Sequence, residues 1–172
     1  MKKTCFAGAV VLASVLSACS GASPANSPSP HLPPPSSPAA PTSPPSSVLG
    51  IWKGTYTCQQ GLTGLTLDIA QAQGNDAGLD AEFDFYAVAA NPGVPSGRGT
   101  QRGTYTAGRL ILTWQAFTTQ PAGYGGVNLN GSLTGSGTTQ TLSGTVAAVS
   151  GGTACTTFSL TRTSSTGTSA NG

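Results

Sequence analysis

Apolar and polar residues alternate with a period of two along most of the chain after residue 47. Leu65, Leu67 and Ile69 are separated by small or polar residues, and Val127 and Leu129 follow the same rule. No stretch of this region keeps an apolar repeat at helical spacing. Because neighbouring side chains of a strand point to opposite faces, the pattern predicts strands with one dry and one wet face, and hence an all-β domain.

Eight such runs follow one another, separated by short segments that contain Gly, Asn, Asp or Pro. Glycine-containing segments such as 106–108, 135–137 and 150–152 are typical of tight hairpin turns, which favour antiparallel neighbours. We expect strands near residues 50–58, 62–71, 79–88, 98–106, 109–117, 126–134, 139–148 and 154–163.

The first residues carry a different pattern, in which Lys2 and Lys3 precede an apolar stretch and then small residues. This order is typical of a secretory signal. A transmembrane helix is the alternative, but the uncharged segment 5–18 is shorter than the about 20 residues that a span needs. We expect residues 1–18 to be a signal peptide.

Leu16, Ser17, Ala18 and Cys19 close this segment, and together they resemble the lipobox of bacterial lipoproteins. The resemblance implies cleavage before Cys19 and attachment of lipid to its thiol. A diacylglyceryl group with a further acyl chain, such as palmitate, would anchor the chain durably in a membrane. We therefore expect an anchored lipoprotein on the extracytoplasmic face of the bacterial cell envelope.

Residues 19–47 are expected to form a disordered linker, since ten of the thirteen prolines and no charge lie in this segment. Pro-rich spacers extend by about 3.1 Å per residue, so the linker could reach on the order of 90 Å. A proline-recognition ligand or an O-glycosylated stalk are alternatives. One domain of residues 48–163 and a disordered tail of residues 164–172 complete the chain.

Charge and cysteine content limit the possible partners of the domain and the state of its cysteines. Without Lys2 and Lys3, the seven Lys and Arg residues fall to five, against five Asp and Glu. Such a domain lacks the clustered cations that nucleic acid requires. If Cys5 leaves with the signal and Cys19 is lipidated, Cys58 and Cys155 remain in an oxidising compartment, where a pair predicts one disulfide, with two free buried thiols as the alternative.

The disulfide would join the end of the first strand to the start of the last, two ends that lie side by side in an antiparallel pair. We therefore expect a small antiparallel up-and-down β-barrel of about eight strands, closed by one disulfide, with a two-layer β-sandwich as the alternative. Gly54-Thr55-Tyr56-Thr57 recurs as Gly103-Thr104-Tyr105-Thr106. We interpret these glycines as leaving room for a neighbouring aromatic ring, with an old duplication as the alternative.

Gly50 and Trp52 on the first strand and Arg162 on the last resemble the Gly-x-Trp and overlying basic residue of lipocalins and their calycin relatives. The resemblance implies a Trp52–Arg162 cation–π contact that closes the barrel. If Cys58 sat directly opposite Cys155, however, Trp52 would face Thr161. A bulge, or a disulfide beyond the regular ladder, would remove this conflict.

Tyr56-Thr57-Cys58 and Cys155 also resemble the outline of lipid-anchored inhibitors of C-type lysozyme. That family acts through a loop with Ser-Gly before a strand, and Pro95-Ser96-Gly97-Arg98 is the nearest equivalent here. The usual tyrosine after this loop is absent, and the domain is longer.

Catalytic chemistry finds little support. The only histidine, His31, lies in the linker, so the domain has no imidazole for a triad or a His-based metal site. Asp80, Glu82 and Asp84 share one strand face and would suit a glycosidase pair, but we favour exposed ion pairs with Arg98 and Arg102. Around a glycine-rich turn, Asn75, Asp76 and Asp80 could supply oxygens to calcium, without full calcium-loop spacing. We expect no enzyme, no metal and no cofactor.

These observations predict a non-catalytic binding module that contacts an envelope protein or glycan, through loops that include Pro95, Ser96, Arg98, Pro121 and Tyr124. The alternative is a lipocalin-like carrier of a small apolar ligand or envelope lipid, which an internal cavity lined by Trp52, Tyr105 and Trp114 would favour. An enzyme inhibitor of lysozyme-inhibitor type is the third hypothesis.

Overall fold

The computed structural model describes residues 47–74, 77–151 and 154–166. The predicted signal peptide, the lipobox with Cys19 and the linker lie outside the described residues, apart from Ser47. So do Asn75 and Asp76 of the calcium hypothesis, and residues 167–172 of the expected tail.

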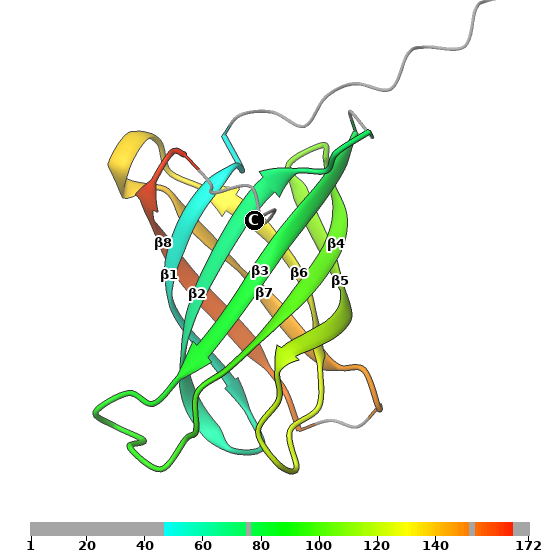
Figure 1. Cartoon of the computed structure of the whole chain (residues 1–172). Coiled ribbons are helices and arrows are strands. Elements are labelled where there is room, and N and C mark those ends of the chain that lie inside the picture. Colours follow the sequence, from blue (N-terminus) through cyan, green and yellow to red (C-terminus); the bar gives the residue numbers. More distant parts are fainter. Residues whose placement is uncertain (1–46, 75–76, 152–153, 167–172) are drawn as a thin grey trace, which may run out of the picture. The chain divides into compact units, whose positions relative to one another are not determined.

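Eight antiparallel strands form a closed barrel in which each strand pairs with its sequence neighbours and β1 pairs with β8 (Figure 1). The strands are β1 (Gly50–Cys58), β2 (Gly61–Gln71), β3 (Gly78–Tyr86), β4 (Gly97–Thr106), β5 (Arg109–Thr119), β6 (Val127–Thr134), β7 (Thr141–Ala148) and β8 (Thr157–Ser164). The predicted up-and-down barrel is confirmed, and the sandwich alternative is wrong.

The connection between β6 and β7 differs from the predicted tight turn. It contains a short 3₁₀ helix, η1 (Gly137–Thr139), and β7 begins at Thr141 rather than at residue 139. Gly135 and Gly137 both adopt positive φ, +76° and +61°, and the Thr139 amide and hydroxyl both donate to Ser136 O. The second glycine thus starts a further turn, so the β6–β7 hairpin has a longer connection than the expected tight turn.

The predicted disulfide between Cys58 and Cys155 is confirmed, but it lies beyond the β1–β8 ladder. β8 begins only at Thr157, and before it the Thr156 amide donates to Thr57 O at 3.0 Å. Because Cys155 is off the ladder, Trp52 can pair with Arg162. The register conflict is removed in this way, and a further irregularity falls between Ile51 and Trp52.

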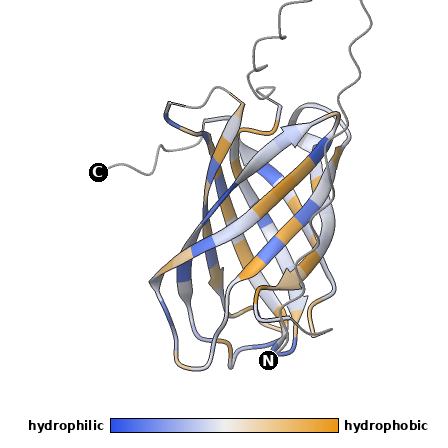
Figure 2. Cartoon of the chain, turned by 90° about the vertical axis from the view of Figure 1, so that its right-hand side faces the viewer, coloured by the Kyte–Doolittle hydropathy of each residue, from blue (hydrophilic) through white to orange (hydrophobic). Residues whose placement is uncertain are grey.

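The inward-facing residues of all eight strands form the core, and Figure 2 shows the hydrophobic and hydrophilic residues alternating along the strands. On β4, two inward positions are Gly97 and Gly99. A β-carbon at these positions would collide with the rings of Phe85 and Trp114 respectively. Small residues on β4 therefore make room for large rings from its neighbours, as dense packing requires.

The same explanation is wrong for Gly54 and Gly103. A β-carbon on Gly54 would collide with the backbone carbonyl of Ser159, and one on Gly103 with that of Ile111. No ring fills these spaces. Both glycines instead let two strands approach more closely than side chains would allow, which is the other known reason for glycine in a strand.

Candidate functional site

One end of the barrel, which we call the sealed end, is closed by Val48, Trp52 and Arg162. The Trp52 and Val48 side chains are fully buried, and Trp52 Nε1 donates to Val48 O at 2.9 Å. The Arg162 guanidinium carbon lies 5.4 Å from the Trp52 ring centroid, within cation–π range. The described chain enters the barrel at this end, and β8 finishes there (Figure 1).

Arg162 also ties together three segments that are distant in sequence. From β8, its guanidinium donates to Leu49 O, just before β1, and to Gln140 Oε1 at 2.8 Å, in the β6–β7 connection. Since the planar guanidinium carries five donors, one side chain can stack on a ring and bond to carbonyls at the same time.

The opposite end, which we call the open end, carries the disulfide and the longest connections. Residues 87–96, 120–126 and 149–156 join their strands there. Asn91 Nδ2 donates to Gln60 O at 2.6 Å and to Leu62 O at 3.1 Å, so the first of these connections is attached to the β1–β2 turn.

β5 is irregular in its second half, toward the open end. Two register shifts between β4 and β5 bend the second half of β5, as bulges do. Its ladder with β6 covers only Arg109–Leu112, and beyond it the Trp114 amide donates to the side-chain oxygen of Asn128 at 2.9 Å. β5 therefore diverges from β6 toward the open end, and there the Trp114 ring of β5 packs against Gly126.

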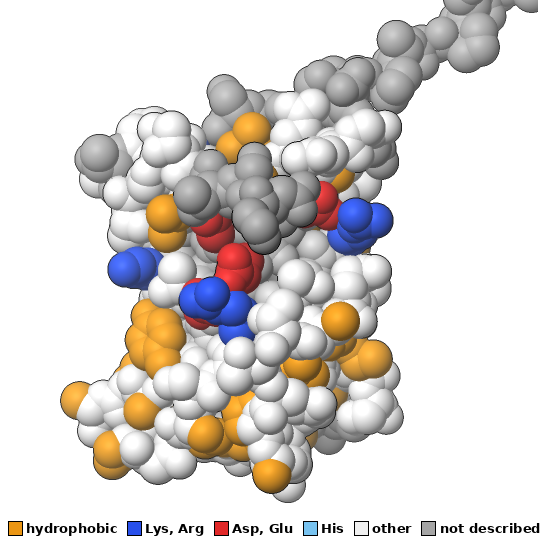
Figure 3. Space-filling model, in the orientation of Figure 1, with side chains coloured by type: hydrophobic (Ala, Val, Ile, Leu, Met, Phe, Trp, Pro, Cys, Tyr) orange, Lys and Arg blue, Asp and Glu red, His pale blue; other side chains and the backbone are white. Residues whose placement is uncertain are grey.

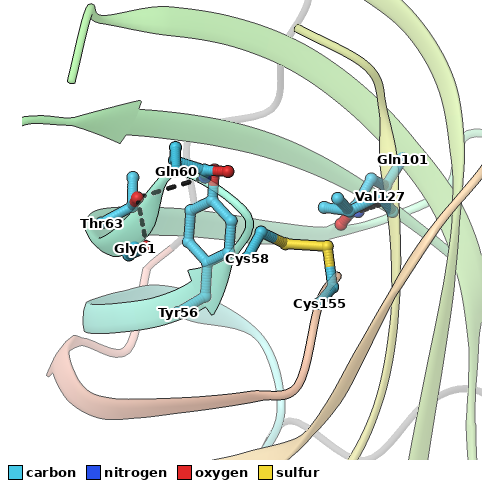
Figure 4. Close-up of a disulfide and its surroundings, with 8 residues drawn as sticks. All are labelled: Tyr56, Cys58, Gln60, Gly61, Thr63, Gln101, Val127 and Cys155. Atoms are coloured by element: carbon cyan, nitrogen blue, oxygen red, sulfur yellow. Dashed lines mark hydrogen bonds between the residues drawn. A yellow bond between two sulfur atoms is a disulfide. The ribbon is translucent and has the colours of Figure 1, made fainter. Parts of the chain in front are cut away.

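A pocket of about 410 Å³, which we call the mouth pocket, lies at the open end. It is formed by the β1–β2 turn, the end of the 120–126 connection and the segments around the disulfide. Figure 4 draws Tyr56, Gln60, Val127 and the disulfide from its lining. Its lining residues are Tyr56, Cys58, Gln59, Gln60, Gly123, Tyr124, Gly125, Gly126, Val127, Ala148, Ser150, Ala154 and Cys155. The volume lies within the range of about 300–1,000 Å³ that small-molecule sites occupy.

Polar groups at the floor of the mouth pocket are ordered by Gln60. Its Nε2 donates to the Tyr56 hydroxyl at 3.1 Å and to Thr63 Oγ1 at 3.2 Å, as Figure 4 shows. Burial, and secondarily the nearby Tyr124, raise the pKa of Tyr56 well above its ordinary value of 10.0. Tyr56 therefore stays a neutral hydroxyl throughout the physiological pH range.

A chain of aromatic contacts leads from Tyr56 to Tyr124. Tyr56 meets Phe83 edge-on at 5.4 Å between ring centroids, Phe83 lies 6.3 Å from Phe85, and Phe85 is stacked on Tyr124 at 5.4 Å and 16°. Phe83 also meets Trp114 edge-on at 5.8 Å. These rings fill the barrel beneath the mouth pocket and hold the Tyr124 ring in place.

A second hollow, which we call the outer groove, lies on the outside of the same end. It has a volume of about 330 Å³, and its lining residues are Asp84, Phe85, Tyr86, Ser96, Gly97, Arg98 and Thr119.

The structure brings most of the predicted contact residues to the open end. Ser96 and Arg98 line the outer groove, Tyr124 lines the mouth pocket, and Pro121 lies against Gly97. Pro95 is exposed in the same connection. Because Phe85 lines the outer groove and stacks on Tyr124, it stands between the two hollows.

Gln60 and Phe85 were missed as site residues. Gln60 lies in the two-residue turn after Cys58 and has no distinctive sequence context. Its place between two predicted strands could only have suggested an exposed polar group. Phe85 follows the inward alternation of β3, which by itself indicates a core residue, and most of its side chain does lie in the core. Only the position of Tyr124 over its ring shows a second role.

The strand acids form ion pairs on the outer wall. Arg102 lies 2.8 Å from Asp80, and Arg98 lies 2.7 Å from Glu82 and also bonds to Asp84. The hydrogen bond and charge of Asp84 raise the pKa of Arg98. Figure 3 shows acidic and basic side chains together on this face, and none on its lower part toward the open end. The exposed ion-pair interpretation is thus correct.

Three further observations concern metal sites, membrane-spanning helices and the predicted internal cavity. Among the described residues no three His, Cys, Asp or Glu side chains gather in a way that could hold a metal ion. No helix within those residues has the length and hydropathy to cross a bilayer. Neither hollow is lined by Trp52, Tyr105 or Trp114, the residues predicted for an internal carrier cavity.

Searches of protein-family models, curated proteins and solved structures find no match to this chain.

Proposed function

We propose that the chain is a lipid-anchored protein of the bacterial cell envelope that presents a non-catalytic binding module, and that this module contacts a protein or glycan partner through the open end. The observation that carries the proposal is the position of the two ends. Val48, which follows the proposed linker from Cys19, accepts the hydrogen bond of Trp52 at the sealed end, and both hollows belong to the other end.

The environment of the candidate reactive groups among the described residues supports a binding role. Both domain cysteines are joined in the disulfide, and the acids of β3 are engaged by Arg98 and Arg102. The only histidine of the chain, His31, falls in the linker. Among the described residues, no base lies beside the neutral Tyr56 hydroxyl to make it a nucleophile.

The shape of the open end supports contact with a partner. Surface connections held by a rigid scaffold are common places for binding residues. Here the connection 87–96 is attached to the β1–β2 turn through Asn91, and Tyr124 is stacked on Phe85. A surface that is already ordered loses less conformational entropy when a partner binds.

Anchoring is tested by replacing Cys19 with Ser and separating membranes from soluble material. We expect the wild type in the membrane fraction, labelled by radioactive palmitate, and Cys19→Ser in the soluble fraction without label. A Cys19→Ser chain that remained membrane-bound would contradict the anchor.

Partner contact is tested by the accessibility of single introduced cysteines. Ser96→Cys places a thiol at the open end, and Ser136→Cys, also at an exposed position, places one at the sealed end. We expect a maleimide to label Ser96→Cys more slowly in intact cells than in the purified chain, and Ser136→Cys at the same rate in both. Equal labelling of Ser96→Cys in cells and in isolation would contradict a bound partner at this end.

A further inference from the structure

We infer that the mouth pocket binds a neutral saccharide, which packs on the Tyr124 ring and exchanges hydrogen bonds with Tyr56 and Gln60. The inference rests on the proposed binding role of the open end and names the ligand class. Four properties of the pocket lead to it: its charge, its depth, its polar groups and its aromatic wall.

The pocket is uncharged. Its lining contains Tyr, Gln, Gly, Ser, Ala, Val and the disulfide, but no Asp, Glu, Lys or Arg. An ionised ligand would lose its hydration without gaining an opposite charge, which is costly. The chemistry therefore favours an uncharged molecule over a phosphate, a carboxylate or an amine.

The pocket is also shallow. Tyr56 and Val127 at its floor are only 4% and 6% exposed, and the next layer of the barrel is filled by Phe83, Leu129 and Phe158, each nearly fully buried. A long acyl chain would need to enter this filled interior. A compact ligand of one or a few rings fits the space above the floor.

The floor offers one free donor and one free acceptor. Because the Tyr56 hydroxyl accepts a hydrogen bond from Gln60 Nε2, its own proton remains available. Gln60 Oε1 accepts no hydrogen bond from any other described residue. A sugar hydroxyl both donates and accepts, so one such group would satisfy Tyr56 and Gln60 together.

Tyr124 supplies a flat apolar wall. One face of its ring is stacked on Phe85, and its backbone is held by hydrogen bonds within its turn, from its amide to Pro121 O and from Gln120 Nε2 to its carbonyl. A pyranose ring carries C–H groups on its faces and hydroxyls around its rim. An aromatic wall beside neutral hydrogen-bonding groups matches both parts of such a molecule.

Gly125 allows the pocket to be blocked without disturbing the fold. It lines the pocket, a β-carbon on it would meet nothing within 4 Å, and its φ lies outside the left-handed region. Gly93 shares the last two properties but lies in the 87–96 connection and does not line the pocket. Gly125→Leu and Gly93→Leu are therefore a matched pair.

The experiment uses the detergent-solubilised mature chain. It is applied to an array of neutral and acidic oligosaccharides, the best neutral hit is titrated calorimetrically, and palmitate and sialyllactose are titrated as apolar and charged probes. We expect binding to neutral saccharides only. Gly125→Leu should weaken it at least about tenfold through steric exclusion, and Tyr56→Phe about fivefold through one lost hydrogen bond. Gly93→Leu should bind like the wild type.

Binding to no neutral saccharide, a preference for palmitate or sialyllactose, or equal binding by Gly125→Leu and the wild type would each overturn the inference. Circular dichroism of every variant checks folding, and Tyr56→Phe, which changes one oxygen atom, serves if Gly125→Leu fails to fold. A series from mono- to tetrasaccharide then distinguishes a free sugar from the end of a longer glycan as the source.

This outcome can be separated from that of the proposed function. If Ser96→Cys remains protected in cells while no neutral saccharide binds, the open end has another partner and only the saccharide inference fails. If Ser96→Cys is also labelled freely, the binding role of this end fails as well.

Discussion

The two ends of the barrel are built from opposite kinds of contact. At the sealed end, one buried indole, one guanidinium and two backbone carbonyls close the barrel with short connections. At the open end, β5 leaves β6 after Leu112, and residues of the 120–126 and 149–156 connections line a pocket. A covalent bond there holds the first strand to the segment before the last. At the sealed end, where the interior is filled, non-covalent packing is enough to hold the first and last strands together. At the open end, where a pocket interrupts the packing, a disulfide joins them.

The largest effect should come from removing this covalent bond. The bridge closes a loop with a sequence separation of 97, and the chain-entropy model gives about 4.7 kcal/mol for a loop of about 100 residues. We expect Cys58→Ser/Cys155→Ser to lose about that much free energy of unfolding in urea titrations. Reducing agent should lower the stability of the wild type to that of the variant, and a double variant as stable as the wild type would show that packing alone closes the open end.

The sealed end should depend almost as strongly on a single side chain. Trp52→Ala removes a fully buried indole together with its bond to Val48 O and its contact with Arg162, and should cost about 3–5 kcal/mol. Val149→Ala, at a residue that is 54% exposed, is the control and should change stability by less than about 0.5 kcal/mol. If both variants unfolded at the same urea concentration, this end would not be closed by Trp52.

Alkaline pH should affect the open end through Tyr56. Its pKa is raised in the fold, mainly by burial, so the unfolded chain releases this proton near pH 10.0 while the folded chain keeps it. The contribution to stability is thus fully present below pH 10.0 and is lost as pH rises above it, by at most about 1.4 kcal/mol per pH unit.

Tyr56→Phe should reduce this loss. Tyr105, whose pKa burial also raises, accounts for a remaining part, and Tyr105→Phe measures it. The free energy of unfolding of both proteins is measured between pH 8 and 11. If it falls equally with pH in Tyr56→Phe and in the wild type, Tyr56 ionises as freely in the fold as in the unfolded chain.

The outer wall should contribute least. Arg102 bonds to one acid and is 70% exposed at its side chain, while Arg98 contacts two acids and is 53% exposed. We expect Arg102→Gln to cost about 0.2–1 kcal/mol, Arg98→Gln somewhat more, and both differences to shrink in about 1 M salt. Equal, salt-independent losses would indicate packing by the arginine stems rather than ion pairing.

Much of the fold could be predicted because its determinants are local. Alternation along each strand and glycine-containing turns require only neighbouring residues, and they indicated eight strands in the observed order. Cys58 ends the first predicted strand and Cys155 begins the last, so a disulfide between them predicted that these two strands pair and close the barrel. The predicted contact residues Ser96, Pro121 and Tyr124 do come together at one end, because successive hairpins return to the same side of a barrel.

The remaining features depend on how distant strands approach one another. Gly54 and Gly99 look alike in sequence, yet one faces a backbone carbonyl and the other an indole ring. The buried Gln101, whose Nε2 donates to Val127 O at 2.7 Å, resembles a solvated strand residue until the barrel closes around it.

The order of residues alone therefore predicted the strands, their antiparallel succession and the disulfide partners, since these follow from alternation, turn chemistry and the positions of two cysteines. Tertiary structure decided the off-ladder position of the disulfide, the divergence of β5 from β6 and the mouth pocket. These features arise from register and bulges between strands that are far apart in sequence. A shift of one residue turns a side chain from the interior to the outside, and no local pattern specifies it.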